Sequence, residues 1–183
     1  MSIVGIVGKK FSGKDTCADF LVDNMNYKKF SFAKGLKQVC QVAFLLSDEQ
    51  LYDPSHKEIV DERWGKTPRE LMQFVGTDLF RTYFDRNIWL KRLEIDIESF
   101  PEIQNIVIPD VRFENEYRFL QEYAQKKGIP CFMIHIERDC EKHDTHSSEN
   151  FEWLENYTNS FHEIENNSSF TELYQKIQNI LKY

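Results

Sequence analysis

The residues with the clearest chemical potential form a glycine-rich loop near the N-terminus. Gly8 and Gly13 are separated by four residues and followed directly by Lys14, a spacing typical of loops that bind phosphate through backbone N–H groups. A β-branched apolar run at residues 3–7 precedes the loop, and apolar residues at helical intervals follow it. Strand, loop and helix therefore predict an anion site to which the helix N-terminus and the lysine both contribute positive charge.

The metal-binding position of this loop departs from the common pattern. Ser or Thr usually follows the lysine and contacts Mg²⁺, whereas here Asp15 comes first and Thr16 second. Either residue could hold the metal, directly or through a water molecule. The residues of this segment predicted to bind ATP are Gly8, Lys9, Phe11, Ser12, Gly13, Lys14, Asp15 and Thr16.

Two further segments carry charged residues at positions suited to binding. The helix predicted at 33–46 has Lys37 near its start, where it could bind a second phosphate or simply be solvated. The buried strand predicted at 106–108 is followed by Asp110 and Arg112. Ligands of open α/β sheets bind at the carboxyl ends of strands, so Asp110 could hold Mg²⁺ through water or accept a hydrogen bond from a substrate hydroxyl.

A helix that begins after Thr67 carries a polar stripe. Thr67 and Glu70 have the spacing of a capping box, with proline at the first helical position. Arg69, Gln73 and Gly76 follow at intervals of four and three, and such a stripe suits a phosphorylated ligand that bears a base. An ordinary amphipathic helix with a packing glycine is the alternative. Its predicted packed side consists of Leu71, Val75 and Leu79.

A charged, histidine-rich stretch follows the strand predicted at 131–136. Residues 138–148 lack apolar periodicity, which indicates either a lid or a plain surface loop. Arg138, at the entrance, could neutralise charge on a transferring phosphoryl group. Cys140, His143 and His146 resemble part of a zinc site, but a fourth ligand and a finger-like spacing are missing. A polar loop is therefore the preferred interpretation.

Composition narrows the class of protein. The chain has 183 residues and a formal net charge of −7, which disfavours an extended nucleic-acid groove. No apolar run reaches membrane-spanning length, and the N-terminus predicts a strand rather than a signal peptide, so we expect a cytoplasmic protein. The four cysteines include no C-x-x-C pair and are expected to be reduced and mostly packed.

The alternation of strands and helices predicts an α/β fold. We expect a three-layer α/β/α sandwich with a mostly parallel sheet of about five strands. The remaining strands are expected at 27–32 and 160–164, and a closing helix follows a second capping box formed by Ser169 and Glu172. The predicted organisation is one domain, 1–183, with a helical insertion at 34–100 and a lid at 138–149.

Several motifs together resemble one protein family. They are Gly-Lys-Lys-Phe-Ser-Gly-Lys-Asp-Thr at 8–16, Lys-Thr-Pro-Arg-Glu-Leu at 66–71, Asp-Val-Arg-Phe-x-Asn-Glu at 110–116, and His146 with Ser148-Glu149. In this order they resemble the deoxynucleoside monophosphate kinases encoded by tailed bacteriophages and some large DNA viruses. The source could be viral or cellular. The resemblance covers nearly the whole chain and implies a P-loop kinase fold.

The resemblance also implies an activity and a set of binding residues. Family members use Mg²⁺ and ATP to convert a dNMP to a dNDP, and a homodimer is among the implied partners. The resemblance implies that Lys37, Arg69 and Arg112 meet the acceptor phosphate and that Asn166 approaches adenine. Lys14 and Arg138 are the predicted catalytic residues. The full predicted substrate-binding set is Lys37, Trp64, Arg69, Gln73, Asp110, Arg112, His146 and Glu149.

Two alternative functions stay open on the sequence. The first is a kinase for another phosphorylated metabolite, since phosphomevalonate and dephospho-coenzyme A kinases share related loops. The second is a nucleotide-binding regulatory module with little turnover, for which we expect ATP binding without acceptor-dependent ADP release. The density of charge at the predicted strand ends argues against this second alternative.

Overall fold

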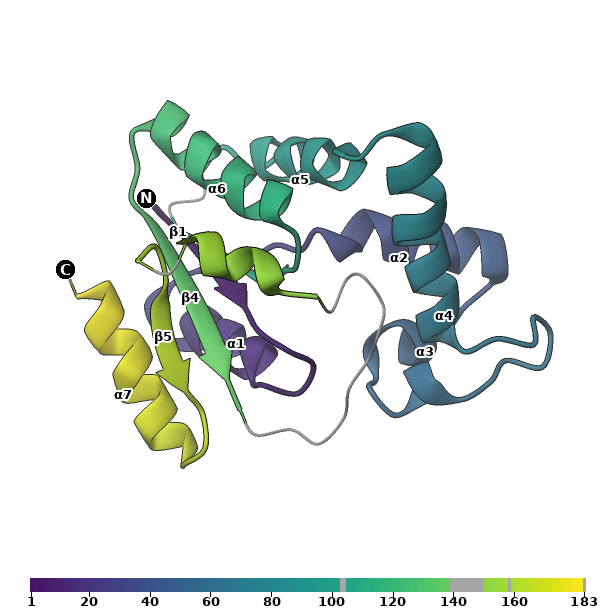
Figure 1. Cartoon of the computed structure of the whole chain (residues 1–183), viewed down its shortest axis with the longest axis horizontal. Helices are drawn as coiled ribbons and strands as arrows, with labels where there is room; N and C mark the ends of the chain where they lie inside the picture. Colours follow the sequence, from purple (N-terminus) through teal and green to yellow (C-terminus); the bar gives the residue numbers. More distant parts are fainter. Residues whose placement is uncertain (103–104, 139–149, 158, 183) are drawn as a thin grey trace. The chain divides into compact units, whose positions relative to one another are not determined.

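The computed structural model divides the chain into two compact units (Figure 1). It describes residues 1–102, 105–138, 150–157 and 159–182. We call Met1–Ser31 with Asp96–Tyr183 the sheet unit and Phe32–Ile95 the helical unit. The two are described separately below.

The sheet unit is built on five parallel strands, which confirms the predicted sheet. The strands are β1 (Ser2–Val7), β2 (Lys28–Lys29), β3 (Asn105–Val111), β4 (Cys131–Glu137) and β5 (His162–Glu165). Their spatial order is β2-β3-β1-β4-β5, and every neighbouring pair is parallel. β1 therefore lies at the centre. β2 is shorter than the strand predicted at 27–32, and β5 begins two residues later than predicted.

Helices cover both faces of this sheet, as the three-layer prediction requires (Figure 1). They are α1 (Lys14–Met25), α6 (Glu114–Lys127) and α7 (Phe170–Leu181). Val4 and Ile6 of β1 are packed in one core with residues of α1 and α7. Because successive strand residues point to opposite faces, Gly5 faces α6, where a Cβ would lie 2.9 Å from Leu120. β1 is thus buried on both faces.

The helical unit is a small bundle with its own core. Its helices are α2 (Ala33–Phe44), α3 (Asp48–Tyr52), a 3-10 turn (His56–Glu58), α4 (Pro68–Gln73), a π-helix (Phe74–Phe84) and most of α5 (Ile88–Glu98). The core cluster contains Cys40, Leu46, Leu51, Leu71 and Val75. The capping box of α4 is confirmed, since Glu70 N donates to Thr67 Oγ1 and Thr67 N donates to the Glu70 carboxylate.

The packing predicted for the end of this helix is wrong. Leu79 was expected on the packed side, but 41% of it is exposed. The α-helical turn gives way to a π-helix at Phe74, and its wider i→i+5 turns rotate later residues away from the i, i+4 stripe. Gly76 packs against Leu36, whose Cδ2 would lie 2.8 Å from an added Cβ, so this glycine has a packing role, and ligand binding by Arg69 and Gln73 stays a prediction.

The second predicted capping box forms only in part. Ser169 Oγ accepts a hydrogen bond from Glu172 N at 3.3 Å at the start of α7. The Glu172 carboxylate instead accepts from the Ser168 hydroxyl at 2.6 Å. One half of the reciprocal pair is sufficient to mark the helix start.

The cysteines in the described part of the chain are all reduced and mostly packed, as expected. Cys17 and Cys40 are buried, and Cys131 is half-buried. Burial raises the pKa of the Cys17 thiol to about 12 and that of Cys40 to about 11, so neither is a thiolate at neutral pH. The part of a possible zinc site noted in the sequence lies outside the described residues; it consists of Cys140, His143 and His146.

No helix among the described residues is long and apolar enough to cross a lipid bilayer.

Candidate functional site

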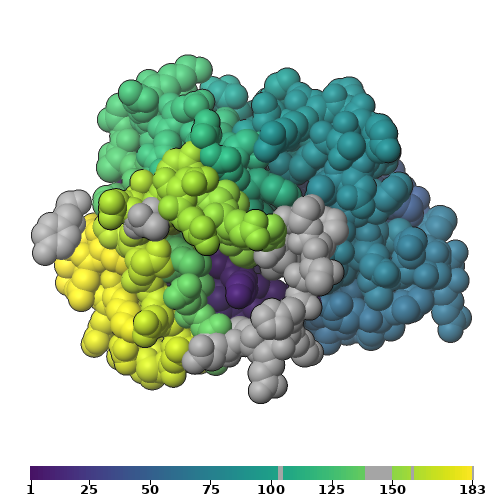
Figure 2. All heavy atoms as spheres, in the orientation of Figure 1, coloured from purple at the N-terminus to yellow at the C-terminus, as the bar shows by residue number. Residues whose placement is uncertain are grey.

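The glycine loop connects β1 to α1, as predicted. Gly8 has φ +153°, and an added Cβ would lie 2.4 Å from the backbone oxygen of Ile136. Gly13 has φ +102°, and its Cβ would lie 2.4 Å from Asn166 Nδ2. Both positions therefore require glycine, for backbone conformation and for space. Figure 2 shows the purple atoms of the N-terminal segment reaching the surface beside the green atoms of β4.

The loop presents hydrogen-bond donors suited to an anion. Lys14 Nζ donates to the backbone oxygen of Lys9 at 2.5 Å, so its ammonium lies along the loop. The N-cap residue of α1 is Gly13, which has no side chain to cap the helix. The first backbone N–H groups of a helix have no intrahelical partner, and here they carry the partial positive charge that favours phosphate.

Asn166 supports the loop from the carboxyl end of β5. Its Nδ2 donates to the backbone oxygen of Ser12 at 2.8 Å, and its backbone N donates to Glu137 O at 2.8 Å. Asn166 is buried, and Ser12 is 1% exposed. The hydroxyl oxygen of Ser12 has no hydrogen-bond partner within the described chain, which is the kind of polar atom that a bound anion would satisfy. The adenine contact predicted for Asn166 stays a prediction.

Strand register brings three predicted residues to the same edge of the sheet as the loop. Val7, the last residue of β1, pairs with Val111 of β3 and with His135 of β4. Asp110 and Arg112 are the neighbours of Val111 in the chain, and Arg138 directly follows β4. Asp110 Oδ2 accepts a hydrogen bond from the Ser31 hydroxyl at 2.7 Å. The predicted gathering of charged side chains at the strand ends is therefore present.

Two residues that were not predicted hold the segment around Arg112. The carboxylate of Glu116, 1% exposed, accepts hydrogen bonds from the backbone N–H of Arg112 at 2.7 Å and of Phe113 at 3.1 Å. Trp153 Nε1 donates to the backbone oxygen of Arg112 at 3.1 Å. A glutamate three residues into a helix is a capping signal that could have revealed Glu116. No local signal points to Trp153.

The predicted metal ligands lie at the start of α1. The Asp15 carboxylate is 80% exposed and forms an ion pair with Lys29 at 2.9 Å. Thr16 follows it and is half-buried. Within the described residues, no group of three or more His, Cys, Asp and Glu side chains could surround a metal. The Asp15 carboxylate and the Thr16 hydroxyl supply oxygen, the ligand atom that Mg²⁺ prefers.

A cavity of about 330 Å³ opens beside the loop at the ends of β4 and β5. It contains two predicted residues, Lys9 and Arg138, and lies next to the predicted Asn166. Its lining mixes cations, carboxylates, an amide and an imidazole, so it can accept a polar ligand rather than an apolar one. The lining residues are Lys9, His135, Ile136, Glu137, Arg138, Glu165 and Asn167.

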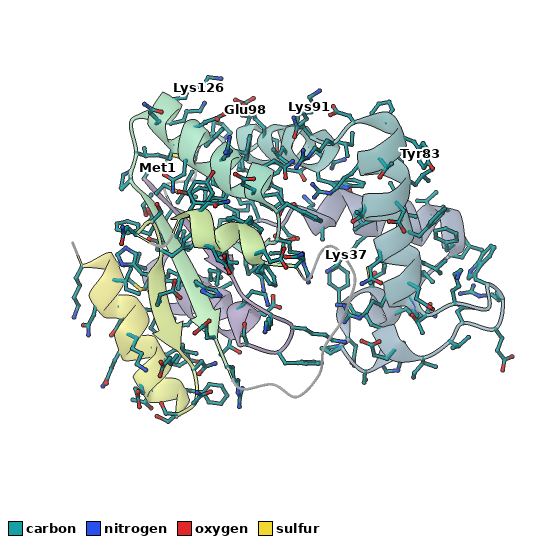
Figure 3. All side chains as sticks on the ribbon, viewed as in Figure 1. Met1, Lys37, Tyr83, Lys91, Glu98 and Lys126 are labelled. Carbon is teal, nitrogen blue, oxygen red and sulfur yellow. The ribbon has the colours of Figure 1, made fainter. Side chains whose placement is uncertain are left out.

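The cations predicted to bind substrate in the helical unit already contact neighbours. The ammonium of Lys37, on α2 (Figure 3), lies 3.9 Å from the centre of the Tyr52 ring. Arg69 Nε donates to Glu58 Oε1 at 2.7 Å. Because this hydrogen bond uses Nε alone, a ligand phosphate could bind the other guanidinium N–H groups, but the Glu58 carboxylate would repel it.

The other predicted substrate residues differ in their surroundings. Trp64 Nε1 donates to the backbone oxygen of Phe44 at 2.9 Å, and the two rings pack edge to face, so its exposed indole is held in place. Gln73 is half-buried at the last position of α4. His146 and Glu149 lie outside the described residues.

Comparison with known sequences gives one family. A family model described as "Deoxynucleotide monophosphate kinase" matches residues 2–62 and 52–177. A protein of Acanthamoeba polyphaga mimivirus, provisionally named deoxynucleotide monophosphate kinase, is 40% identical over 81% of this chain and 81% of its own. The deoxynucleotide monophosphate kinase of Enterobacteria phage T4 is 24% identical over 100% of this chain and 99% of its own. The deoxynucleoside-5'-monophosphate kinase of Escherichia phage T5 is 27% identical over 66% and 72%.

Comparison with solved structures supports the fold. A dephospho-CoA kinase from Campylobacter jejuni matches 100% of this chain and 96% of its own with a TM-score of 0.55 and 13% identity. The Mycobacterium tuberculosis APS kinase CysC matches 100% of this chain and 97% of its own with a TM-score of 0.51 and 13% identity. At this identity the likeness shows a common P-loop kinase fold and carries no information on substrate.

Proposed function

Because this chain belongs to the deoxynucleotide monophosphate kinase family, we propose that it transfers the γ-phosphoryl group of ATP to the phosphate of a deoxynucleoside monophosphate. An oxygen of the acceptor phosphate attacks the γ-phosphorus, the bond to the β–γ bridging oxygen breaks, and dNDP and ADP result. The attacking atom is already a phosphate oxygen, so the step needs positioning and charge stabilisation rather than a strong general base.

The observation that carries this proposal is the register of β1 with β3 and β4. It supports a site in which the glycine loop and Lys14 bind the donor phosphates while Arg138 stabilises charge on the transferring group. The polar cavity beside the loop suits the rest of the donor nucleotide. Alignment of two bound reactants can lower a barrier by about 7–11 kcal/mol. The main contribution of this edge of the sheet is therefore to hold hydrogen-bond donors in fixed positions around the phosphates.

We propose that Asp15 or Thr16 holds Mg²⁺ together with the donor phosphates, and that Asp110 assists through water. The oxygen donors present here fit that ion. When bound, Mg²⁺ neutralises charge on the phosphates. The protein's own contribution is to orient the phosphate chain through backbone N–H groups and to keep Lys14 against it.

For the acceptor, we propose that Lys37 and Arg69 of the helical unit bind the phosphate and that Arg112 of the sheet unit binds substrate phosphate. Arg69 is suited because a guanidinium can grip phosphate with two hydrogen bonds. The proposed substrate-binding set is completed by Trp64, Gln73, Asp110, His146 and Glu149. The region 34–100 then acts as the acceptor-binding insertion and 138–149 as the lid.

The test is ADP release from Mg·ATP with each of the four common dNMPs, the matching NMPs and phosphomevalonate in parallel. We expect fast release with one or more dNMPs and slower release with NMPs. ADP release with phosphomevalonate and with none of the nucleotides would show that the acceptor is not a deoxynucleoside monophosphate. ATP binding without release from any acceptor would contradict the kinase proposal and favour a binding module.

A homodimer is also proposed, on the resemblance to the family. A cytoplasmic location is proposed because no apolar run of the sequence reaches membrane-spanning length. Light scattering during size-exclusion chromatography tests the first, and a single-chain mass at micromolar concentration would contradict it. Fractionation of the producing cells tests the second.

A further inference from the structure

A lysine on the shortest strand of the sheet unit contacts the proposed metal-binding position. Lys29 Nζ donates to Asp15 Oδ1 at 2.9 Å and to Asp19 Oδ1 at 3.0 Å. The two carboxylates lie one turn apart on α1, at i and i+4, where like charges repel. One ammonium therefore neutralises both of them, and one of the two directly follows the phosphate-binding Lys14.

Strand geometry explains why this lysine and not its neighbour reaches α1. Consecutive residues of a strand point to opposite faces. Lys28 accordingly lies over the ring of Phe100, 3.2 Å from its centre, while Lys29 extends to the α1 face. The pair offers a natural comparison, since the two lysines are adjacent and carry the same charge.

These ion pairs contribute little to folding stability. The side chains of Lys29, Asp15 and Asp19 are 34%, 80% and 61% exposed, and exposed pairs typically contribute about 0–1 kcal/mol. Burial lowers the pKa of Lys29, but its hydrogen bonds and attraction to Asp15 and Asp19 outweigh that effect and raise it above the ordinary value. Lys29 is therefore a permanent cation at neutral pH.

We propose that Lys29 is a positioning residue that holds the Asp15 carboxylate beside the phosphate loop until a divalent cation arrives with the nucleotide. This inference rests on the proposed ATP binding at the loop. Asp15 would then be able to hold that ion in place of the ammonium. Asp19 retains Lys29 nearby, so that the exchange leaves no charge without a partner.

The exchange has an electrostatic consequence that can be measured. Without Lys29, the negative charge of Asp15 faces metal-free ATP directly and weakens its binding. With Mg²⁺ present, the same carboxylate meets a cation, and no ammonium competes for it. Loss of Lys29 should therefore increase the ratio of the dissociation constant of metal-free ATP to that of Mg·ATP.

The experiment measures both dissociation constants by isothermal titration calorimetry, with ATP in EDTA and with Mg·ATP, and without an acceptor. For Lys29→Gln we expect the ratio to rise by roughly three- to tenfold, as expected for one partly screened charge a few ångströms away. The matched control is Lys28→Gln, which removes the same charge one residue earlier and should leave the ratio unchanged. Lys29→Arg should restore most of the wild-type value.

A double-mutant cycle assigns the effect to Asp15. In an Asp15→Asn background, Lys29→Gln should no longer change the ratio, since coupled residues are non-additive. The melting temperature of Lys29→Gln should stay within about 2 °C of the wild type. An unchanged ratio in Lys29→Gln, or an equal rise in Lys28→Gln, would overturn the inference while leaving the proposed kinase activity intact. Absence of ATP binding in the wild type would overturn both.

Discussion

The sheet unit and the helical unit position their candidate residues in different ways. In the sheet unit the proposed anion site is made mainly by backbone, and buried side chains fix that backbone: Asn166 donates to Ser12 O, and Glu116 accepts from Arg112 and Phe113 N–H. In the helical unit the candidate cations are side chains that already contact protein groups. Arg69 pairs with Glu58, and Lys37 lies against Tyr52.

The difference indicates two modes of binding. A backbone site held by buried hydrogen bonds is preorganised, so little has to be ordered when the ligand arrives. At a side-chain site whose cations already contact protein groups, the ligand competes with those groups, and affinity is set by the difference between the two interactions. Removal of a protein group that holds the donor site should therefore weaken donor binding. Removal of the protein group that contacts an acceptor-binding cation should strengthen acceptor binding.

The largest effect is expected at Lys14, the lysine that directly follows the second glycine of the loop. Lys14→Ala should lower the rate of acceptor-dependent ADP release by about a thousandfold, because the donor phosphates lose a fixed cation that acts in the transition state. Steady-state kinetics and a thermal melt measure activity and folding. Lys10→Ala, whose ammonium lies over the Phe11 ring, is the control. Activity retained in Lys14→Ala would remove the loop from the mechanism.

The next effect concerns the paired cation of the helical unit. Arg69→Gln should raise KM for the dNMP by roughly ten- to a hundredfold, the loss expected for a charge-assisted hydrogen bond to phosphate. Glu58→Gln should lower the same KM, because the competing carboxylate is weakened. Initial rates at saturating ATP measure both. A rise in KM in both variants would show that the Arg69–Glu58 pair supports the fold instead of competing with the ligand.

A smaller effect distinguishes a buried carboxylate from an exposed one that makes the same kind of contact. Glu116 and Glu70 each accept a backbone N–H at a helix start, but Glu116 is buried and Glu70 is exposed. Glu116→Gln replaces the charged oxygen that accepts both N–H bonds with a neutral amide oxygen, and the loss of this charge assistance should lower the free energy of unfolding by about 1–3 kcal/mol. Glu70→Gln should lower the free energy of unfolding by a smaller amount. Urea titrations of both variants measure this, and equal losses would contradict the comparison.

The smallest effect is an acid-dependent loss of stability in the helical unit. Hydrogen bonds from Arg63 and Gln50 hold the pKa of Asp61 below its ordinary value in the folded chain. Its contribution is therefore complete above the unfolded pKa of about 3.9 and is lost as pH falls through the lower folded value. Asp61→Asn should show a shallower fall in unfolding free energy from about pH 5 to 2. Asp78→Asn is the charge-matched control, and equal slopes in wild type and Asp61→Asn would contradict this assignment.

Local sequence signals account for most of what was predicted. The glycine loop, the Thr67 cap and the five strands follow from residue types at short spacing, and the structure has all of them. The carboxyl-end rule for parallel sheets was enough to group Asp110 and Arg112 with the loop. These features depend on chemistry within a few residues, or on a topology with few alternatives.

The features that were missed depend on contacts distant in the chain or on packing. Trp153 and Arg112 are 41 residues apart, and the Arg69–Glu58 pair spans 11. Lys29 belongs to a strand of two residues, too short for a periodic pattern. The π-helix at Phe74 has no punctuating glycine or proline at its start, so the α-helical period was extended across it and Leu79 was misplaced.

The central place of β1 has a consequence for synthesis. Ser2 of β1 pairs with Asn105 of β3, 103 residues later, and β1 also needs β4. At translation rates of roughly 5–20 residues per second, β3 is synthesised roughly 5–20 s after β1. The helical unit is one continuous segment with its own core, so its contacts become available sooner. The nascent chain therefore exposes an apolar strand during that interval, and a chaperone that binds extended apolar segments would act first on the N-terminus.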